Sequence, residues 1–541
     1  MNKKIFWAIL ILAFILRFYK LGQVPLSLDW DENSNAYNAY SILKTGRDEY
    51  GTFLPITNQS FDDYKPPLYM YLNVVTVVIF GLTPFAARFP SALFGFLTVP
   101  AIYFLAKKLF EKSDVSGQLS VVRSEPIALL AMLMLAISPW HIQFSRVGFE
   151  ATVGLFTAVV AISFLLYALF PKQEDGNFKK SLLWITSGVF FGISLYSYHA
   201  ERVFLPLLFL TFVIIWRREI FSINKKNLAV FVFTCILFTL PLIIFLPKEA
   251  ISQRFKTTTQ DYIVENLDRS VKFIVQDQKE GLGFGKYIHN RRLVIAQGLF
   301  SNYLAHFDLN FLFTTGDDNP RHHIEGMGML YLFELPLIIY GIYQLIKLKN
   351  KQSIFLLSWF LISPVASSPT NVSPHAVRSL TMVIAAEIIS AYALIKIYQI
   401  FKYKRIFLIA SALVIISSLL IYLHNYYSHY KYDFASFWQY GYSQAVIESE
   451  KVKNQYEKIN VDSSLEQAYI FWLFNTKYDP TSYQQLGSRN HFDKYYFNAQ
   501  VPASPKELYI SDAGKFPSGF EVVKTIYYPN GQEAIKIGYP K

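Results

Sequence analysis

The chain has 541 residues, of which 52% are hydrophobic, 17% aromatic and only 17% charged. Soluble globular proteins usually carry about 25% charged residues, so this composition excludes an ordinary soluble protein and indicates a chain that lies mainly in a lipid bilayer. The 51 Lys and Arg residues outnumber the 39 Asp and Glu residues, which gives a formal net charge of +12. The single cysteine, Cys235, excludes an intramolecular disulfide and a zinc site built from cysteines.

The N-terminal segment joins a basic start, Lys3-Lys4, to an apolar run over residues 5–16. A secretory signal peptide begins in the same way, but no small-residue cleavage site follows residues 17–20. We therefore predict a retained first transmembrane helix.

Apolar segments that reach, with their flanks, the length needed to cross about 30 Å of hydrocarbon recur along the chain. With the first segment they predict an α-helical polytopic membrane protein with about eleven transmembrane helices. The other segments are 89–106, 126–140, 149–170, 181–198, 203–216, 228–246, 327–346, 353–367, 376–400 and 406–423.

The segment 66–83 is also apolar, but it opens with Pro66-Pro67, and the positive-inside rule decides its orientation. If it crossed the bilayer, the loop with Lys107, Lys108, Lys112 and Arg123 would lie outside. If it lies in the membrane interface, every basic short loop faces the cytoplasm, so we predict an interfacial helix. The basic short loops are 107–123, 172–180, 217–226, 347–351 and 402–405. Their cytoplasmic placement then accounts for most of the positive charge, which gives no support to nucleic-acid binding.

This topology leaves three extracytoplasmic regions: a first loop at 22–88, a long loop at 247–326 and a tail at 424–541. The tail has strand-like runs and a helix-like stretch, which predict a small α/β domain. We therefore divide the chain into a transmembrane domain, 1–423, and a C-terminal domain, 424–541. The strand-like runs are 507–510 and 521–528, and the helix-like stretch is 437–453.

Ionisable residues other than simple Lys and Arg anchors gather at the predicted outer ends of the helices, where they are candidates for function. Asp31 and Glu32 follow the first helix by about ten residues, and a carboxylate there could act as general base on an acceptor hydroxyl. Single basic residues at helix ends are commonly membrane anchors. Here basic residues recur at several helix ends, opposite a loop rich in carboxylates, which favours a shared outer cavity instead. The candidate residues for this cavity are Arg88, His141, Arg146, Glu150, His199, Arg202, Arg321, His375 and Arg378.

Guanidinium and ammonium groups in such a cavity suit a phosphate, and a phosphate at the membrane surface implies a lipid-linked one. A metal is less well supported: Asp317, Asp318, His322 and His323 supply ligand types, but adjacent histidines on a helix diverge and no His-x-x-x-His spacing occurs. We assign no metal site and leave a divalent metal cofactor open. The glycines at 281–285 lack strand and helix flanks, so nucleotide binding is unsupported.

Seven short runs of the sequence are informative together: 17–22, 29–32, 37–40, 45–51, 63–68, 88–93 and 138–150. They resemble the bacterial polyprenyl-phosphate-dependent glycosyltransferases, membrane enzymes of the GT-C superfamily of the protein O-mannosyltransferase and aminoarabinose transferase type (glycosyltransferase family 39). The resemblance covers roughly residues 5–398 and is strongest over the first 150.

The resemblance implies a helical bundle whose first outer loop, with juxtamembrane helices, covers a cavity for a sugar on a polyprenyl phosphate. It implies that Asp31, with Glu32 beside it, supplies the catalytic carboxylate and that Lys65 and Arg88 lie near the donor phosphate. Glu150 matches an acidic residue of the same site. The chain departs from the aminoarabinose transferases at Tyr64, where they have Glu, which puts a metal site using that position in doubt.

We therefore hypothesise a cell-membrane glycosyltransferase that moves a hexose such as mannose, with inversion, to an extracytoplasmic hydroxyl. Asp31 accepts the proton, and Lys65, Arg88, Arg202 and Arg378 bind the donor phosphate. The acceptor, a protein, glycan or lipid, is left open. The alternative is a non-enzymatic polyprenyl-phosphate transporter or flippase, which would place ionisable groups near the midplane. The predicted substrate-binding residues are His141, Arg146, Glu150, His199, Arg321 and His375.

Overall fold

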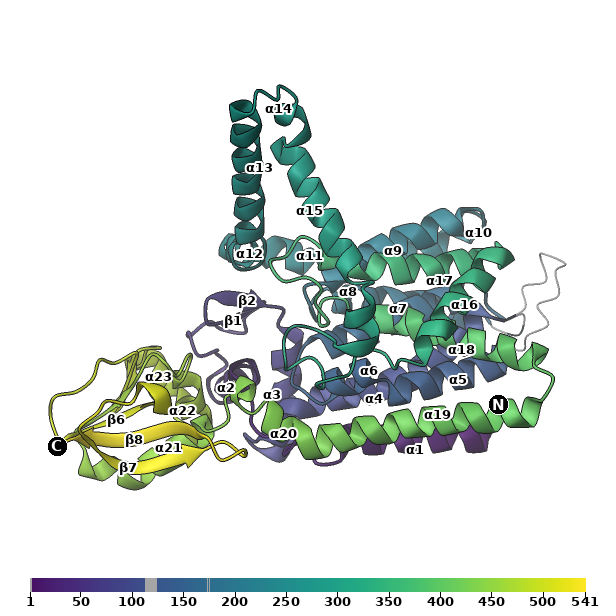
Figure 1. Ribbon diagram of the computed structural model, residues 1–541. Helices are drawn as coiled ribbons and strands as arrows, with labels where there is room; N and C mark the ends of the chain where they lie inside the picture. The colour runs from purple at the N-terminus through teal and green to yellow at the C-terminus, as the bar shows by residue number, and fades with distance from the viewer. Residues whose placement is uncertain (1, 112–123, 173, 175) are drawn as a thin grey trace. The chain divides into compact units, whose positions relative to one another are not determined.

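The computed structural model describes residues 2–111, 124–172, 174 and 176–541, and its chain forms two compact units, both drawn in Figure 1. Lys112 and Arg123, which were used to orient the segment 66–83, lie outside the described residues. The first unit holds Met1–Arg17, Phe94–Ser145 and Glu150–Tyr422, and the second holds Phe18–Leu93, Arg146–Phe149 and Leu423–Lys541.

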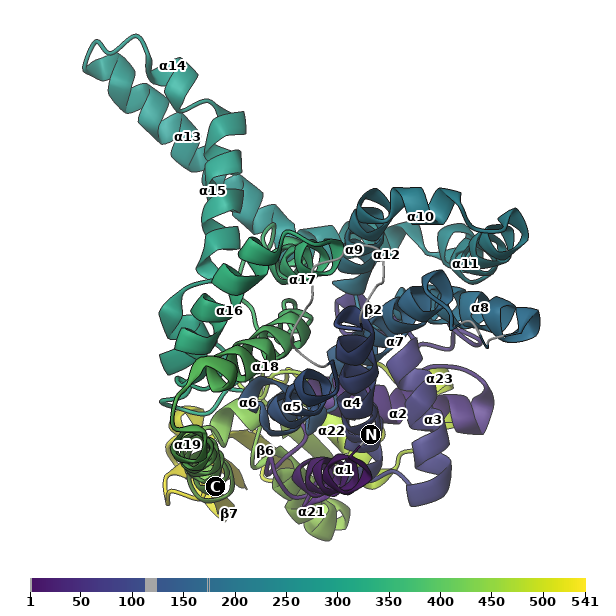
Figure 2. The ribbon, with the colours of Figure 1, turned by 90° about the vertical axis from the view of Figure 1, so that its right-hand side faces the viewer.

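Helices form within all eleven predicted apolar segments, because each run is long enough to bury a side-chain face while satisfying its backbone internally. Figure 2 shows α13 and α15 as a hairpin that projects from the other helices of the first unit. In chain order the helices are α1 Lys3–Phe18, α4 Pro84–Leu109, α5 Ser124–Ile137, α6 Pro139–Ser145, α7 Ala151–Leu169, α8 Asn177–Ser194, α9 Glu201–Ile215, α10 Arg217–Phe221, α11 Lys225–Phe245, α12 Lys248–Phe255, α13 Asp261–Lys279, α14 Gly285–Ile288, α15 Arg291–Ala305, α16 Glu334–Leu348, α17 Lys351–Ile362, α18 Met382–Ile400 and α19 Lys404–His424.

Five stretches among the described residues are long and apolar enough to cross a membrane, and the pair α5 and α6, bent by 58°, makes a sixth if it counts as one span. The count of eleven transmembrane helices therefore stays a prediction. The five are Pro84–Leu109, Ala151–Leu169, Lys225–Phe245, Met382–Ile400 and Lys404–Asp433.

Two helices begin later than predicted, because the preceding backbone is hydrogen-bonded elsewhere. Before α16, the N–H groups of Met329 and Leu330 donate to the carbonyls of Phe311 and Leu312, at 3.2 and 2.7 Å. Before α18, the Ala376 N–H donates to a carboxylate oxygen of Asp317 at 2.5 Å. An apolar run can thus be a buried loop as readily as a helix.

The ambiguous segment 66–83 forms a short helix, α3, over Leu68–Phe80. Its 13 residues extend about 20 Å at 1.5 Å per residue, well short of the roughly 30 Å of hydrocarbon. It ends at Gly81, whose φ of 70° is one that glycine adopts without steric cost. This length is consistent with an interfacial helix.

The second unit contains a polar helix, α2, a two-stranded hairpin and a six-stranded sheet in the order β4-β5-β3-β6-β8-β7. Strand β3 runs parallel to β5 and β6, and the remaining pairs are antiparallel. Both predicted strands and the predicted helix of the tail are present, as β6, β7 and α21. The elements are α2 Trp30–Thr45, β1 Asn58–Ser60, β2 Asp63–Lys65, α20 Tyr430–Asp433, α21 Tyr442–Val452, β3 Lys458–Val461, α22 Tyr469–Thr476, α23 Pro480–Leu486, β4 His491–Phe492, β5 Tyr495–Phe497, β6 Glu507–Asp512, β7 Phe520–Tyr527 and β8 Glu533–Pro540.

The loop 22–88 and the C-terminal tail share one hydrophobic core. Tyr37 of α2, Trp472 of α22 and Ile510 of β6 are all buried in it. The Gln484 side-chain N–H groups donate to Ser41 Oγ at 3.0 Å and to the Asp48 carbonyl at 2.9 Å. The first unit ends at Tyr422, and the loop 22–88 packs with the tail. The division of the chain at 423/424 stays a prediction.

Candidate functional site

The first turn of α2 is fixed by a capping box. Asp29 Oδ1 accepts from the Glu32 N–H at 2.8 Å, and Glu32 Oε2 accepts from the Asp29 N–H at 3.1 Å. Consecutive helical residues point about 100° apart. The turn therefore sends the neighbouring carboxylates of Asp31 and Glu32 in different directions.

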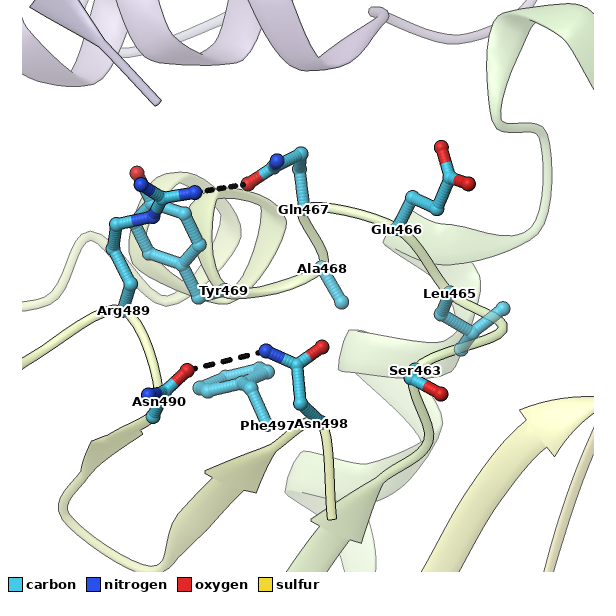
Figure 3. A pocket seen from close by; sticks show the side chains of 10 residues that line it. All are labelled: Ser463, Leu465, Glu466, Gln467, Ala468, Tyr469, Arg489, Asn490, Phe497 and Asn498. Atoms are coloured by element: carbon cyan, nitrogen blue, oxygen red, sulfur yellow. Dashed lines mark hydrogen bonds between the residues drawn. The ribbon is translucent and has the colours of Figure 1, made fainter. Parts of the chain in front are cut away.

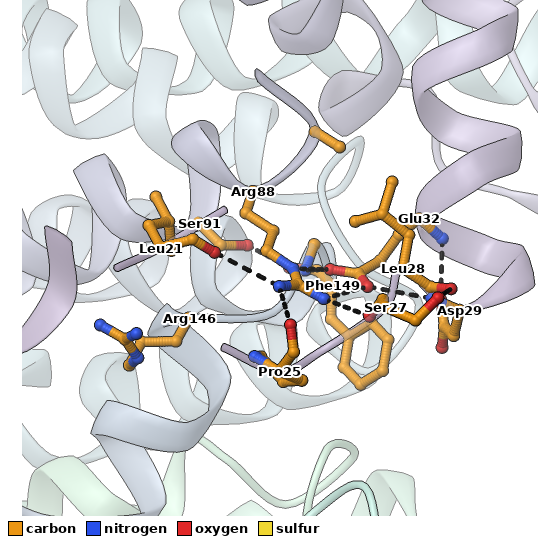
Figure 4. Close-up of polar contacts among 12 residues, drawn as sticks. Leu21, Pro25, Ser27, Leu28, Asp29, Glu32, Arg88, Ser91, Arg146 and Phe149 are labelled. Atoms are coloured by element: carbon orange, nitrogen blue, oxygen red, sulfur yellow. Dashed lines mark hydrogen bonds and ion pairs between the residues drawn. The ribbon is translucent and has the colours of Figure 1, made fainter. Parts of the chain in front are cut away.

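Glu32 forms a fully buried ion pair with Arg88, and both side chains are 0% exposed (Figure 4). Arg88 Nε and Nη2 donate to Glu32 Oε1 and Oε2 at 2.8 and 3.0 Å. The Gly148 N–H donates to Oε1 at 2.7 Å, and a Cβ at this glycine would lie 3.1 Å from Glu32 Cγ. A side chain at this position would press against the carboxylate, so glycine suits this close approach of the backbone.

Arg88 uses all five guanidinium N–H groups within the protein. Besides the two bonds to Glu32, Nη1 donates to the carbonyls of Leu21 and Pro25 at 3.3 and 2.8 Å, and Nη2 to that of Ser27 at 2.6 Å (Figure 4). No donor remains for a phosphate. The pair fastens the start of α4 to α2 and to the loop at 21–27, which favours a structural role. The phosphate-binding role of Arg88 and the catalytic role of Glu32 stay predictions.

Asp31 instead pairs with Lys65, whose Nζ donates to Asp31 Oδ1. The side chains are 31% and 14% exposed, so this pair reaches solvent. Lys65 ends β2 and lies opposite Asn58 of β1 in the hairpin register. The structure thus brings together the two residues, 34 apart in sequence, that were predicted to accept the proton and to contact the donor phosphate.

Arg146 is buried among aromatic and carbonyl partners rather than at a ligand site. Its Nε donates to the Tyr426 hydroxyl at 3.1 Å, and its Nη2 to the carbonyls of Tyr19 and Val24 at 2.8 and 3.3 Å. The guanidinium also lies over the Tyr426 and Tyr427 rings, at 5.2 and 5.4 Å from their centres. These contacts favour a structural role, and substrate binding by Arg146 stays a prediction.

His141 is likewise buried, and its Nδ1 accepts from Arg17 Nη2 at 2.7 Å, because a guanidinium has only donors. Arg17 also donates to the Leu135 and Ala136 carbonyls, at 3.1 and 2.8 Å, at the C-terminal end of α5. These carbonyls lack helical partners because the chain bends there into α6. Through Arg17, His141 therefore supports this broken helix. Substrate binding by His141 stays a prediction.

The other predicted ligands lie in the first unit. Arg202 Nε donates to the Leu195 carbonyl at 3.0 Å and its Nη1 lies 3.4 Å from His199 Nδ1. Arg378 Nη1 donates to Thr370 Oγ1 at 2.6 Å. Phosphate or substrate binding by these residues stays a prediction.

Glu150 and Arg321 belong to the same unit. Glu150 immediately precedes α7 and is 8% exposed. The Arg321 carbonyl accepts from Gln143 Nε2 at 2.7 Å. Their predicted contact with substrate also stays a prediction.

His375 meets two residues of the acidic and histidine-rich segment at 317–323. One ligand atom from each of Asp317, His322 and His375 lies within 4.8 Å of the others. Sequence reasoning singled out Asp317 and His322 as metal-ligand types but grouped them with Asp318 and His323. Their third partner comes from a loop more than 50 residues away, which no local spacing reveals.

A cavity of about 330 Å³ lies in the C-terminal part of the second unit, lined mainly by the loop before α22 and by residues 489–490 and 497–498 (Figure 3). Arg489 on its wall donates to Gln467 Oε1 at 3.3 Å, and to Asp62 Oδ1 and Oδ2 at 2.8 and 3.3 Å. Asp62 lies in the turn between β1 and β2. The ion pair therefore joins the C-terminal sheet domain to the hairpin that ends in Lys65.

Comparison with known proteins points to one fold. The chain is 12% identical, with a TM-score of 0.54, to ArnT of Cupriavidus metallidurans bound to undecaprenyl phosphate, over 99% of this chain and 98% of that one. The chain has the GT-C fold. It also matches the archaeal oligosaccharyltransferase AglB of Archaeoglobus fulgidus, in complex with an inhibitory peptide and a dolichol-phosphate, with a TM-score of 0.51 and 15% identity over 88% of this chain and 64% of that one.

Sequence comparison gives matches to part of the chain only. Residues 64–245 match the family described as dolichyl-phosphate-mannose-protein mannosyltransferase. Two uncharacterised proteins of Aquifex aeolicus are 25% and 29% identical over 231 and 186 residues, which is 42% and 34% of this chain. These matches span 47% and 33% of the relatives' lengths, about half or less.

Sequence reasoning missed two buried carboxyl groups inside the apolar helices of this GT-C protein. Glu334 of α16 and Glu387 of α18 are both 0% exposed. Glu334 accepts from the Tyr331 N–H at 3.1 Å and from Ser390 Oγ at 3.4 Å. Each interrupts an apolar run in the sequence, and that interruption is the signal that identifies such groups.

Proposed function

We propose that the protein is a membrane glycosyltransferase that moves a sugar from a polyprenyl phosphate to the hydroxyl of an extracytoplasmic acceptor. The observation that carries this proposal is the solvent-reaching pair of Asp31 and Lys65 on an otherwise tightly fastened loop. A carboxylate that accepts a proton and an ammonium that binds an anion lie in direct contact there. The lipid phosphates in the related ArnT and AglB structures support a lipid-linked donor.

In the proposed reaction, Asp31 removes the proton from the acceptor hydroxyl as its oxygen attacks the anomeric carbon. The bond from that carbon to the phosphate oxygen breaks, and the polyprenyl phosphate leaves with the bonding electrons. Attack from the face opposite the phosphate inverts the anomeric configuration. Lys65 exchanges its contact with Asp31 for the leaving phosphate, where charge develops and a fixed cation stabilises the transition state most.

We infer a multi-pass cell-membrane protein whose catalytic loop faces away from the cytoplasm, on the basis of the basic short loops. Mannose is the first donor sugar to test, because residues 64–245 match a family that uses dolichyl-phosphate-mannose. The acceptor class stays open among proteins, glycans and lipids.

The test uses the full chain in proteoliposomes with radiolabelled polyprenyl-phosphate mannose or glucose, and it measures release of free polyprenyl phosphate. We expect Asp31→Asn to lower transfer by about 10²- to 10⁴-fold, the usual contribution of a general base, without lowering the unfolding temperature. Asp63→Asn, in the same loop, is the matched control and should transfer like the wild type. Transfer by Asp31→Asn at the wild-type rate would refute the proposal.

One observation favours the alternative of a lipid-phosphate transporter. Glu334 and Glu387 are buried ionisable groups within apolar helices, which are typical of proton-coupled transport. The same proteoliposomes separate the two functions, since a transporter moves the labelled lipid across the bilayer without releasing the sugar. Lipid movement that Glu334→Gln abolishes, in the absence of transfer, would establish the transporter.

A further inference from the structure

Two outer loops of the first unit bring a carboxylate and two imidazoles together. Asp317 and His322 lie between α15 and α16, and His375 lies between α17 and α18. Asp317 and His322 are 2% and 4% exposed, so water does not solvate them freely. One ligand atom from each residue lies within 4.8 Å of the other two. We propose that these three residues bind one divalent transition-metal ion, with zinc preferred.

The donor set selects the class of ion. Two imidazole nitrogens and one carboxylate oxygen are typical of zinc sites that keep a fourth position for water or substrate. Mg²⁺ and Ca²⁺ prefer oxygen ligands, so two histidines disfavour both ions. Cysteine sites are excluded because the single cysteine, Cys235, lies in α11.

The distances suit one shared ion. His322 Nδ1 and Asp317 Oδ2 are 3.0 Å apart. Two ligand atoms bonded to zinc at about 2.0–2.1 Å with tetrahedral angles are separated by about 3.3 Å, so this pair needs only a small shift to bind the same ion. The third ligand, His375, has its ring centre 5.1 Å from that of His322.

The surroundings hold the ligands in place, as outer-shell hydrogen bonds do in metal sites. Asp317 Oδ1 accepts from the Asn319 N–H at 2.7 Å, and Oδ2 from the Ala376 N–H at 2.5 Å. The backbone N–H of His375 donates to His306 Nε2 at 3.2 Å.

The His375 ring supplies the second observation. Its Nδ1 is buried and has no hydrogen-bond partner among the residues that the structure describes. A buried polar atom without a partner costs about 1–3 kcal/mol, and coordination to an ion would remove that cost at this ring. The ion would also join the two loops, so its expected effect is on the stability of the first unit, independent of the transfer reaction proposed for Asp31.

The test measures the metal content of the full chain, purified in detergent through an affinity tag without histidine. We expect about one zinc ion per chain by mass spectrometry, and a lower unfolding temperature after chelation that added zinc restores. Reloading with Co²⁺ should give the visible absorption bands of a tetrahedral site. His322→Ala and His375→Ala should each lose the ion and these bands.

The matched control is His289→Ala. His289 Nε2 also faces an aspartate, at 3.5 Å from Asp277 Oδ2, but no third ligand joins that pair among the described residues. This variant should keep the metal. Wild-type protein that binds neither Zn²⁺ nor Co²⁺ would overturn the proposal, as would unchanged metal content in both His322→Ala and His375→Ala. Because wild-type metal binding is measured first, a variant that fails to fold does not decide the question.

Discussion

Two ion pairs on adjacent residues of α2 have opposite properties. The Glu32–Arg88 pair is 0% exposed on both sides and every guanidinium N–H is used within the protein. The Asp31–Lys65 pair is 31% and 14% exposed and joins a carboxylate to a single ammonium. The same charge types thus build structure where they are buried and fully hydrogen-bonded, and remain accessible to ligands where they reach solvent.

The difference follows from the helix and from the cations. The first turn directs the two carboxylates about 100° apart, so one enters the protein and the other faces outward. Arginine suits the buried position because its planar fork binds a carboxylate through two bonds and has further donors for carbonyls. Lysine suits the accessible position because its flexible stem can carry the ammonium from the carboxylate to a phosphate.

Breaking the buried pair should have the largest effect. Arg88→Ala leaves the Glu32 carboxylate buried without its cation, and we expect a loss of about 3–5 kcal/mol in the free energy of unfolding. Thermal unfolding and size-exclusion chromatography in detergent measure it. Replacing both partners with apolar residues, Arg88→Met with Glu32→Leu, should cost less than either single change. A double variant less stable than both single variants would contradict the structural role of the pair.

A third carboxylate of the same loop, Glu49, tests the effect of burial on the pKa of a single group. Glu49 is 3% exposed and accepts from Asn38 Nδ2 at 2.9 Å, and burial raises its pKa to about 7. Because this pKa lies above that of the unfolded chain, near 4.5, the stability that protonated Glu49 contributes is full below about pH 4.5 and is lost as the pH rises through 7. The loss is about 3 kcal/mol, at 1.36 kcal/mol per pKa unit.

Glu49→Gln should remove this pH dependence. The amide stands in for the protonated acid, so we expect the variant to unfold at a higher temperature than wild type at pH 8 and to match it near pH 4.5. Unfolding temperatures across this range measure the difference. Identical slopes in the two proteins would show that Glu49 carries no stability difference with pH.

The sequence predicted where transmembrane-type helices form more accurately than where they begin. It also identified charged residues that meet in the structure, but not which of them are buried. A helix lies within each predicted apolar run, but α13 and α15 lie in the predicted long loop 247–326. Residues 327–333 and 376–381 are not helical, because composition does not report backbone hydrogen bonds. Asp31 and Lys65 were identified and do meet. The buried ion pair of Arg88 and Glu32 was not predicted, because a sequence shows a charge but not its burial. Two features were not predicted because they join residues far apart in the sequence. They are the meeting of His375 with Asp317 and His322, and the common core of α2 and α22.

The accessible pair should contribute to binding more than to folding. We expect Lys65→Ala to lower the free energy of unfolding by less than about 1 kcal/mol, as for other partly exposed pairs. It should lower kcat/KM for the lipid-linked donor by about 10- to 100-fold, since a hydrogen bond to a charged group contributes about 1.5–3 kcal/mol. Lys65→Arg should restore most of the donor affinity. An unchanged kcat/KM in Lys65→Ala would remove the phosphate from the proposed mechanism.

The exposed pair of Arg489 and Asp62 should have the smallest effect, although it lies on the same hairpin as Lys65. Asp62 is 75% exposed, so solvent and salt screen the interaction, and we expect a coupling energy below about 1 kcal/mol. A double-mutant cycle of Arg489→Gln and Asp62→Asn, measured by denaturant unfolding at low and high salt, determines it. A coupling that exceeds this value and persists at high salt would mean that the C-terminal domain fixes the hairpin, and the cycle repeated on donor KM would then test whether that domain also positions Lys65.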